Sequence, residues 1–263
     1  MYVVQEAYRG TGIGKQIWNA AISHLGSRNK GLSAVSALLP VYRDKAGFSH
    51  IADWTVDLYK LEDTSTLCKQ LSKSTDSVSA EFAAFHQKSQ RRLITNSDHT
   101  LDINTNRAFD NENQWKLSTT LITKELIQDV IAYDFSLHFY DRSKIIALTL
   151  NEKNCRSRVA FRGGKVVGYG CLKPNLQGLW MLSPLYADDE EVARQLFCDL
   201  LSTLSPNEQK SGVVLKSPSN NQSAISLLKS FGFEKQTYSL RRCYTQNVGQ
   251  PFHNLQPTKS QHK

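Results

Sequence analysis

Apolar residues in the first sixty positions follow two different spacings. After Gly12 they recur every three or four residues, as in an amphipathic helix, and Gly26 and Ser27 end that pattern. Between Ser33 and Leu39 they alternate or run together, as in a buried strand, until Pro40. This alternation of strands and helices predicts an α/β layer. The expected elements are a strand end at 2–4, a helix over 12–25, a strand over 33–39, a helical turn over 42–46 and a strand over 54–59.

The residue composition changes between positions 62 and 117. Ser, Thr, Asn and Asp are dense there and apolar periodicity is weak, which is typical of loops and linkers. Within this segment, residues 79–92 have a helical pattern and residues 95–112 are typical of a loop. We therefore expect a first domain over 1–61, a linker or insertion over 62–117, a second domain over 118–245 and a disordered tail over 246–263.

Ordered patterning returns after residue 118. Apolar residues form a helical stripe from Leu121 to Leu137, and the turn from Arg162 to Lys165 contains two glycines between apolar runs, which is typical of a β-hairpin. The predicted fold class is α/β (α+β), with mixed sheet layers covered by helices on both faces. The expected elements are helices over 121–137, 142–150, 188–204 and 221–231, and strands over 158–161, 166–172, 179–182, 212–215 and 233–244.

Composition restricts the class of protein. The 263 residues are 40% hydrophobic and 21% charged, which is typical of a globular domain. No apolar run approaches the roughly 18 residues of a membrane span, and the N-terminus lacks the pattern of a signal peptide. We therefore expect a cytoplasmic protein with no membrane partner.

The net charge could indicate nucleic-acid binding and the cysteines could indicate a metal site, but the spacing of the residues disfavours both. The net charge is +8, but the basic residues are scattered and do not alternate with aromatics, so we expect no nucleic-acid partner. The five cysteines never occur as CxxC and the seven histidines lack ligand spacing, so we expect no metal site.

A glycine-rich turn from Arg9 to Gly14 separates the first expected strand from the first expected helix. Unpaired N–H groups at such a helix start lie at the positive end of the helix dipole and bind phosphate oxygens. Glycines at 10, 12 and 14 allow close backbone approach to a pyrophosphate, and Arg9 adds a cation. The GxGxxG dinucleotide fingerprint is not matched, since Gln16 and Ile17 are not glycine, and GxxxxGK[ST] is not matched either.

This turn resembles the [QR]-x-x-G-x-[GA] pyrophosphate loop of the GNAT N-acetyltransferases. Residues 41–48, Val-Tyr-Arg-Asp-Lys-Ala-Gly-Phe, resemble the Y-x-x-x-GF element of the same family. The resemblance implies that acetyl-CoA binds as a cosubstrate between two splayed strands and that an acetyl group passes directly to an amine acceptor, whose identity stays open. The implied acyl-CoA-binding residues are Val4, Arg9, Gly10, Thr11, Gly12, Ile13 and Gly14.

Tyr42 is the candidate catalytic residue that this resemblance implies. In the family, a tyrosine before the Gly-Phe pair commonly protonates the departing CoA thiolate. The alternative role of Tyr42 is that of an aromatic ring packed beneath the sheet. A base that deprotonates the amine is also required. Glu6 lies near the loop in sequence, but a solvated carboxylate is the favoured interpretation for it, and we predict no base.

The second half resembles the second domain of tandem GNAT proteins. Asp134 with Asp141-Arg142 resembles a Y-D…D-R element, and residues 221–224 with 231–233 resemble an N-x-x-A…GF motif. Residues 183–191, where a pyrophosphate loop belongs, contain no glycine. Their four consecutive carboxylates suit a helix N-terminus and would repel a pyrophosphate. The implied architecture is two GNAT-like mixed-sheet layers, the first incomplete at its N-terminal side.

The second domain is expected to shape or complete the acceptor site instead of binding CoA in the ordinary way. Asp134, Arg142 and Tyr186 are the candidate substrate-binding residues, and a buried ion pair between Asp134 and Arg142 is the alternative. Asn221 is expected to cap the helix that follows it, whereas contact with CoA is the role that the resemblance implies.

Two functions follow from these features. The first is an N-acetyltransferase that transfers an acetyl group from acetyl-CoA to an amine. The second is a non-catalytic, GNAT-derived module that binds CoA or regulates another activity. The intact loop after Val4 favours the enzyme, whereas the incomplete first domain and the glycine-free second domain favour the module.

Overall fold

The structure is a computed structural model that describes residues 4–69 and 116–247. The chain forms two compact units. The smaller contains the described residues 4–57, 218–220 and 238–247, and the larger contains 58–69, 116–217 and 221–237. Strands β2 (His50–Leu61) and β8 (Glu234–Tyr244) contribute residues to both units.

Part of the predicted domain organisation lies outside the described residues. This applies to the helix expected over 79–92, the loop expected over 95–112 and nearly all of the tail after residue 246. The predicted division of the chain at 62–117 therefore stays a prediction.

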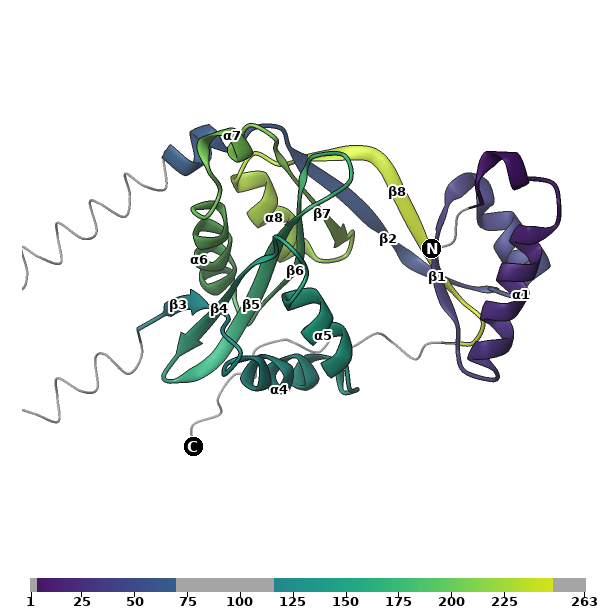
Figure 1. The fold of residues 1–263 in the computed structure, drawn as a ribbon, viewed down its shortest axis with the longest axis horizontal. Helices are drawn as coiled ribbons and strands as arrows, with labels where there is room; N and C mark the ends of the chain where they lie inside the picture. Colours follow the sequence, from purple (N-terminus) through teal and green to yellow (C-terminus); the bar gives the residue numbers. More distant parts are fainter. Residues whose placement is uncertain (1–3, 70–115, 248–263) are drawn as a thin grey trace, which may run out of the picture. The chain divides into compact units, whose positions relative to one another are not determined.

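The smaller unit contains one long helix, short turns and three strands (Figure 1). Gly12 precedes the helix and Gly26 ends it, as predicted. The strand expected over 33–39 is shorter, because its second half becomes a 3-10 helix and Pro40 precedes a helical turn. Proline suits that place because its fixed φ fits the start of a helix. In chain order the elements are η1 (Glu6–Tyr8), α1 (Ile13–Leu25), β1 (Gly31–Val35), η2 (Ser36–Leu38), η3 (Val41–Lys45), β2 and β8.

The strands of the smaller unit follow the order β1-β8-β2, and β1 pairs antiparallel with β8. The small core is formed by Ala34, Phe48 and Cys243, which are buried. Six partly buried residues pack against it: Trp18, Ile22, Leu32, Leu39, Tyr42 and Ala46. The apolar face of α1 that the sequence predicts thus covers these strands through Trp18 and Ile22.

The larger unit contains a mixed sheet with the strand order β2-β7-β6-β5-β4-β3. Strands β4 and β5 are antiparallel, whereas β6 and β7 run parallel and pair at Trp180–Val213 and Met181–Val214. This mixture of parallel and antiparallel strands, together with the helices of the unit, confirms the predicted α/β fold class. The elements are β3 (Ser118–Leu121), α4 (Ile127–His138), α5 (Ser143–Leu150), β4 (Arg156–Arg162), β5 (Lys165–Pro174), β6 (Trp180–Ala187), α6 (Glu190–Leu201), α7 (Pro206–Gln209), β7 (Val213–Pro218) and α8 (Gln222–Ser230).

Two sequence-based boundaries in this unit are wrong. Leu121 does not begin a helix, because it ends β3, where it pairs with Arg158 of β4. Residues 183–187 do not form a loop, because β6 continues through them to Ala187 and pairs with β5. In both cases pairing with a neighbouring strand decides the local structure, and sequence spacing alone does not reveal that partner.

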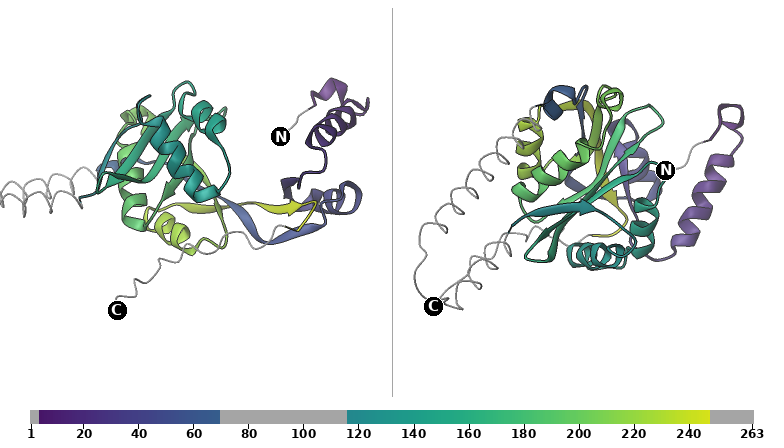
Figure 2. Two further views of the ribbon diagram at one scale, coloured as in Figure 1. Left: turned by 90° about the horizontal axis from the view of Figure 1, so that it is seen from below. Right: turned by 60° about the vertical axis from the view of Figure 1, so that its left-hand side comes forward.

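Helices cover both faces of the sheet in the larger unit, as Figures 1 and 2 show. On one face, α4 and α5 bury Val130 and Ile146 against Val159 and Tyr169. On the other face, α6 buries Val192 and Leu196 against Ala160. A larger core with α6 and α8 is formed by Tyr59, Leu172, Trp180, Leu182, Phe197, Leu200, Leu201, Leu204, Val213, Leu215, Leu227, Leu228, Phe231 and Phe233.

The predicted hairpin at residues 162–165 is confirmed. Gly163 and Gly164 have φ values of 59° and 70° and connect β4 to β5. Two successive residues with positive φ form the turn whose twist matches that of antiparallel strands, and glycine adopts this conformation at little cost.

Gly212 shows how tightly the start of β7 packs. Its φ is +77°, and a Cβ atom there would lie 2.5 Å from the Glu62 carbonyl oxygen and 2.6 Å from that of Leu61. Gly178 has a similar φ of +78°, but a Cβ atom there would meet nothing within 4 Å. An alanine at Gly178 would therefore cause backbone strain alone, whereas an alanine at Gly212 would cause both backbone strain and a steric clash.

We predict that Gly212→Ala lowers the free energy of unfolding more than Gly178→Ala does. The left-handed conformation alone costs an alanine about 1–2 kcal/mol, which is the expected effect at Gly178. Gly212→Ala adds a clash with two backbone oxygens that cannot rotate away. Urea unfolding followed by circular dichroism measures both variants, and equal destabilisation would contradict the packing described here.

Candidate functional site

The predicted pyrophosphate loop forms an open helix start in the smaller unit. Gly10 and Gly12 have φ values of 81° and 88°, and Gly12 is the N-cap residue of α1 without a side-chain cap. A Cβ atom at either glycine would meet nothing within 4 Å, so the space in front of the loop is open. Glycine is needed here for the left-handed backbone, which L side chains rarely adopt.

The turn before the helix holds the loop in shape. The Thr11 hydroxyl donates to the Tyr8 carbonyl oxygen at 2.7 Å, and Arg9 Nε donates to the Val4 carbonyl oxygen at 3.3 Å. The Arg9 backbone N–H donates to the Glu6 carbonyl oxygen at 3.0 Å. Val4 itself lies outside any strand.

The structure thus groups the predicted acyl-CoA-binding residues around one helix start. From Arg9 to Ile13 they are exposed, and Gly14 is half-buried. The positive end of the α1 dipole and the Arg9 guanidinium both favour an anion at this position. Chemically, this arrangement can hold a phosphate-bearing ligand.

Tyr42 lies in an aromatic cluster in the same unit. Its ring centroid is 5.9 Å from that of Trp18 on α1 and 6.4 Å from that of Phe48, which is buried. The Phe48 backbone N–H donates to the Tyr42 carbonyl oxygen at 3.0 Å. The ring therefore packs as the sequence-based alternative describes, and its catalytic role stays a prediction.

The start of α6 in the larger unit has the opposite electrostatic character. Asp189 caps the helix by accepting a hydrogen bond from the Val192 backbone N–H at 3.0 Å. Arg162 bridges Asp189 and Glu191, with N–O distances of 2.7 Å to each, and the Tyr133 hydroxyl donates to Asp188 at 2.7 Å. The hydrogen bond from Arg162 lowers the pKa of Asp189. This helix start is satisfied by carboxylates of its own chain.

The three candidate substrate-binding residues of the larger unit meet around a buried carboxylate. Asp134, on α4, is only 1% exposed. Its Oδ2 lies 3.3 Å from Arg142 Nη1 and accepts a hydrogen bond from the Tyr169 hydroxyl at 2.6 Å. Arg142 Nη1 lies 3.5 Å from the Tyr186 hydroxyl. The ion pair expected as an alternative is thus present, and Tyr186 joins it.

His138 completes this cluster, which we call the Asp134 cluster: Asp134, His138, Arg142, Tyr169 and Tyr186. His138 Nε2 lies 3.5 Å from Asp134 Oδ2, and its ring contacts the Tyr186 ring edge-on, with centroids 5.1 Å apart. Asp134 Oδ1 and His138 Nε2 are buried atoms that have no hydrogen-bond partner among the residues that the structure describes. The sequence gives a partial signal for His138, since it follows Asp134 by one helical turn, and none for Tyr169.

Burial governs the protonation of the cluster. It raises the pKa of Tyr169, and the hydrogen bond to Asp134 raises it further. It lowers the pKa of His138, assisted by the Arg142 charge and opposed by Asp134. For Arg142, burial lowers the pKa, but contacts with Tyr186 and Asp134 outweigh that effect and the pKa is raised. The cluster therefore contains a cationic Arg142 and a His138 biased toward its neutral form.

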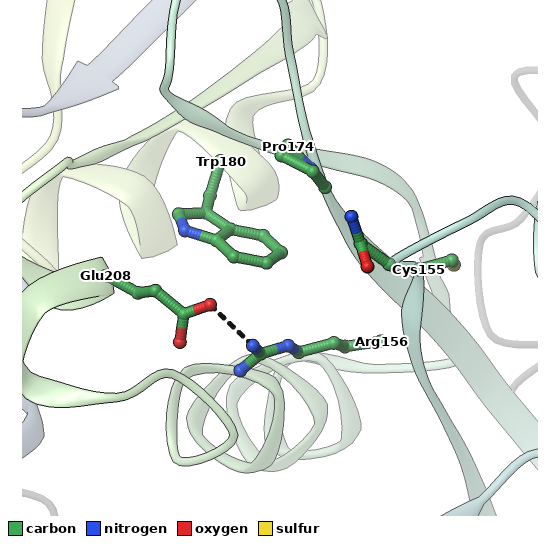
Figure 3. A pocket seen from close by; sticks show the side chains of 6 residues that line it. Cys155, Arg156, Pro174, Trp180 and Glu208 are labelled. Atoms are coloured by element: carbon green, nitrogen blue, oxygen red, sulfur yellow. Dashed lines mark hydrogen bonds and ion pairs between the residues drawn. The ribbon is translucent and has the colours of Figure 1, made fainter.

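A depression of about 430 Å³ in the larger unit is lined by residues that contact one another (Figure 3). The Arg156 guanidinium lies over the Trp180 ring at 4.7 Å and pairs with Glu208 at 2.6 Å. Arg156 also donates to the Thr203 carbonyl oxygen. Its cationic group is thus already engaged by its own chain.

No helix in the described parts of the chain is long and apolar enough to cross a membrane. Within the same residues, no group of three or more His, Cys, Asp or Glu side chains could hold a metal ion.

Comparison with known proteins relates part of the chain to a known family. Residues 130–254 match the model of an acetyltransferase (GNAT) domain. A candidate acetyltransferase from Pyrococcus horikoshii shares the fold, with a TM-score of 0.55 and 15% identity over 93% of this chain and 63% of that chain. A conserved protein of unknown function from Staphylococcus epidermidis gives a TM-score of 0.51 and 12% identity over 90% of this chain and 79% of that one.

Residues 130–254 are therefore those of a GNAT acetyltransferase domain, and the fold of the chain is similar to that of the Pyrococcus horikoshii protein. This chain spans less than two thirds of the Pyrococcus horikoshii chain. A comparison with curated proteins gives no match. The expectation of a tandem protein with an incomplete first domain stays a prediction.

We predict that Tyr169→Phe destabilises the protein more than Tyr186→Phe. The Tyr169 hydroxyl is a buried donor to a carboxylate at 2.6 Å, and loss of such a bond costs about 2 kcal/mol. Within the described part of the chain the Tyr186 hydroxyl has only a 3.5 Å contact to Arg142, so the expected cost of its removal is under about 1 kcal/mol. Urea unfolding compares the two variants. The reverse order would contradict the geometry of the Asp134 cluster.

Proposed function

We propose that this protein transfers an acetyl group from acetyl-CoA to the nitrogen of an amine acceptor. The observation that supports the proposal most is the uncapped helix start at Gly12, in a chain whose residues 130–254 match a GNAT acetyltransferase domain. A pyrophosphate there would receive N–H groups from the first turn of α1 and charge from Arg9. A Cβ atom at Gly10 or Gly12 would meet nothing within 4 Å, so the backbone of the loop is open to an approaching ligand.

The proposed reaction is a direct displacement. The amine nitrogen attacks the thioester carbonyl, a carbon–nitrogen bond forms, and the carbon–sulfur bond breaks to release CoA thiolate. The amine gives up one proton, and the thiolate takes one. We propose Tyr42 as the proton donor to the thiolate, on the basis of its place before the Gly-Phe pair. Its position beside Trp18 on α1 supports a place in the same unit as the loop.

A non-catalytic module that binds CoA or regulates another activity is the second candidate. The observation that favours it is the α6 start, where Arg162 and the carboxylates at 188–191 occupy the place at which a GNAT domain would bind a pyrophosphate. On this alternative the loop at Gly12 binds acetyl-CoA, but no amine is acetylated. Binding and turnover must therefore be measured separately.

We predict that Gly12→Asp weakens acetyl-CoA binding by at least about tenfold, equivalent to 1.4 kcal/mol. The new carboxylate would stand in front of the α1 N-terminus and repel the pyrophosphate. The matched control is Gly26→Asp, at the other end of the same helix, where φ is also positive and the added Cβ also meets nothing within 4 Å. Isothermal titration calorimetry with acetyl-CoA gives both affinities.

The control also defines how the binding proposal fails. If wild-type protein does not bind acetyl-CoA, the loop is not a CoA site and both candidate functions lose their support. If Gly12→Asp and Gly26→Asp weaken binding equally, the binding site lies elsewhere.

We predict that Tyr42→Phe lowers the turnover number about 10²–10⁴-fold while acetyl-CoA affinity changes little, since a general acid contributes to the transition state and not to ground-state binding. Tyr8→Phe, an exposed tyrosine beside the loop, is the control and should retain activity. A thiol-release assay with a panel of small amines, amino acids and polyamines measures turnover. Unchanged turnover in Tyr42→Phe would remove Tyr42 from the mechanism.

A further inference from the structure

Two thiols, Cys155 and Cys171, meet on one face of the hairpin formed by β4 and β5. All five cysteines of the chain are free thiols. Cys155 directly precedes β4, in which Ser157 pairs with Cys171 of β5. Residues two apart in a strand share a face of the sheet, so Cys155 is a diagonal neighbour of Cys171. A hydrogen bond joins the two side chains.

The two members of this pair differ in their access to solvent. Cys155 is half-buried, and its side chain points away from the Trp180 ring (Figure 3). Cys171 is fully buried, and its thiol donates to the Ser183 carbonyl oxygen of β6 at 2.9 Å. An external reagent therefore meets Cys155 first, while Cys171 is held in place behind it.

A thiol donor and a cation lie beside Cys155. The hydrogen bond from Cys171 lowers the pKa of Cys155; burial opposes this effect, the Lys173 charge adds to it, and Glu152 opposes it. Lys173 lies on the same face of β5 as Cys171, and its ammonium group pairs with Glu152 at 2.5 Å. The hydrogen bond and burial raise the pKa of Cys171. The thiolate of the pair therefore forms at Cys155, in a partly exposed and electropositive place that favours reaction at sulfur.

The other three cysteines lie in environments that disfavour a thiolate. Burial raises the pKa of Cys68, Cys198 and Cys243, and that of Cys198 reaches about 11. Cys198 is half-buried like Cys155, so exposure alone does not distinguish them. At neutral pH the thiolate fraction of Cys155 is about a hundredfold larger, and the lower nucleophilicity of a less basic thiolate reduces this advantage to about tenfold.

We propose that Cys155 and Cys171 form a peroxide-reactive thiol pair, in which Cys155 is the attacking sulfur and Cys171 is the resolving sulfur. The Cys155 thiolate attacks one oxygen of hydrogen peroxide, the oxygen–oxygen bond breaks, and the released hydroxide takes up a proton to form water. A sulfenic acid remains on Cys155. The Cys171 sulfur then attacks the sulfenic sulfur, a sulfur–sulfur bond forms, and the hydroxyl leaves with the Cys171 proton as a second water. Both sulfurs are oxidised and the peroxide is reduced.

The disulfide requires a local movement at Cys155. The two sulfurs must approach to about 2.05 Å from hydrogen-bonding distance. Cys155 is held by a turn hydrogen bond to the Glu152 carbonyl oxygen at 3.0 Å, and it precedes Arg156, the first residue paired with β5. Its backbone can therefore shift while the pairing of β4 with β5 is kept. Both cysteines belong to the larger unit, so the pair can be tested without acetyl-CoA.

The test is treatment of the full, reduced chain with hydrogen peroxide, followed by digestion with trypsin and mass spectrometry. Four trypsin sites lie between the two cysteines, so a disulfide joins two separate peptides. We expect peptide 154–156 to be linked to the peptide that contains Cys171, and dithiothreitol to reverse the link. Dimedone, which traps sulfenic acids, should label Cys155 about tenfold faster than Cys198.

Three variants assign the roles. Cys171→Ser removes the resolving thiol, so peroxide should leave a dimedone-reactive sulfenic acid on Cys155 and no link. Cys155→Ser should leave Cys171 unmodified under the same conditions. Cys198→Ser, at another half-buried cysteine, is the matched control and should form the link as wild type does. Circular dichroism verifies that each variant folds.

Three results with the wild-type protein would overturn the inference, and they need no variant. The first is that peroxide produces no link between Cys155 and Cys171. The second is that dimedone labels Cys198 as fast as Cys155. The third is that the link forms as fast in urea as in the folded protein, because the folded arrangement then contributes nothing. None of these results bears on acetyl-CoA binding at Gly12, so this inference and the proposed acetyl transfer fail separately.

Discussion

The buried carboxylate of Asp134 is the constraint on which one face of the larger unit depends. A carboxylate in a protein interior must be paired with a cation and with hydrogen-bond donors, because burial removes its hydration. Asp134 obtains them from Arg142, at the start of α5, and from Tyr169 on β5, and His138 lies one turn further along α4. The polar cluster thereby fixes two helices on the sheet, next to the apolar contacts of Val130 and Ile146.

Helix α1 of the smaller unit and helix α6 of the larger unit differ in what lies at their N-terminal N–H groups. At α1 a glycine in the left-handed conformation occupies the N-cap position and no side chain caps the helix. At α6 Asp189 caps the helix, and Arg162 neutralises the surrounding carboxylates. The first arrangement leaves a positive potential for an external anion, while the second uses that potential internally. This contrast supports the assignment of acetyl-CoA binding to the loop at Gly12 within the proposed function.

Much of the local structure could be predicted because it depends on neighbours in sequence. The helix after Gly12, the hairpin at Gly163-Gly164 and the Asn221 cap, which accepts from the Ala224 backbone N–H at 3.0 Å, are each set within a few residues. The errors at Leu121 and at residues 183–187 share another origin. Both segments become strands because a neighbouring strand pairs with them, and such long-range pairs overrule the local hydrophobic spacing.

The candidate site shows the same division. The sequence by itself determined the glycine loop, the run of carboxylates and the choice of Asp134, Arg142 and Tyr186 as polar residues of interest, since residue type and spacing express this chemistry directly. Only the tertiary structure decided that Tyr169 and His138 complete the cluster. The physical reason is that hydrogen bonding and burial depend on groups brought from α4, α5, β5 and β6, and their distances arise only when these elements pack together.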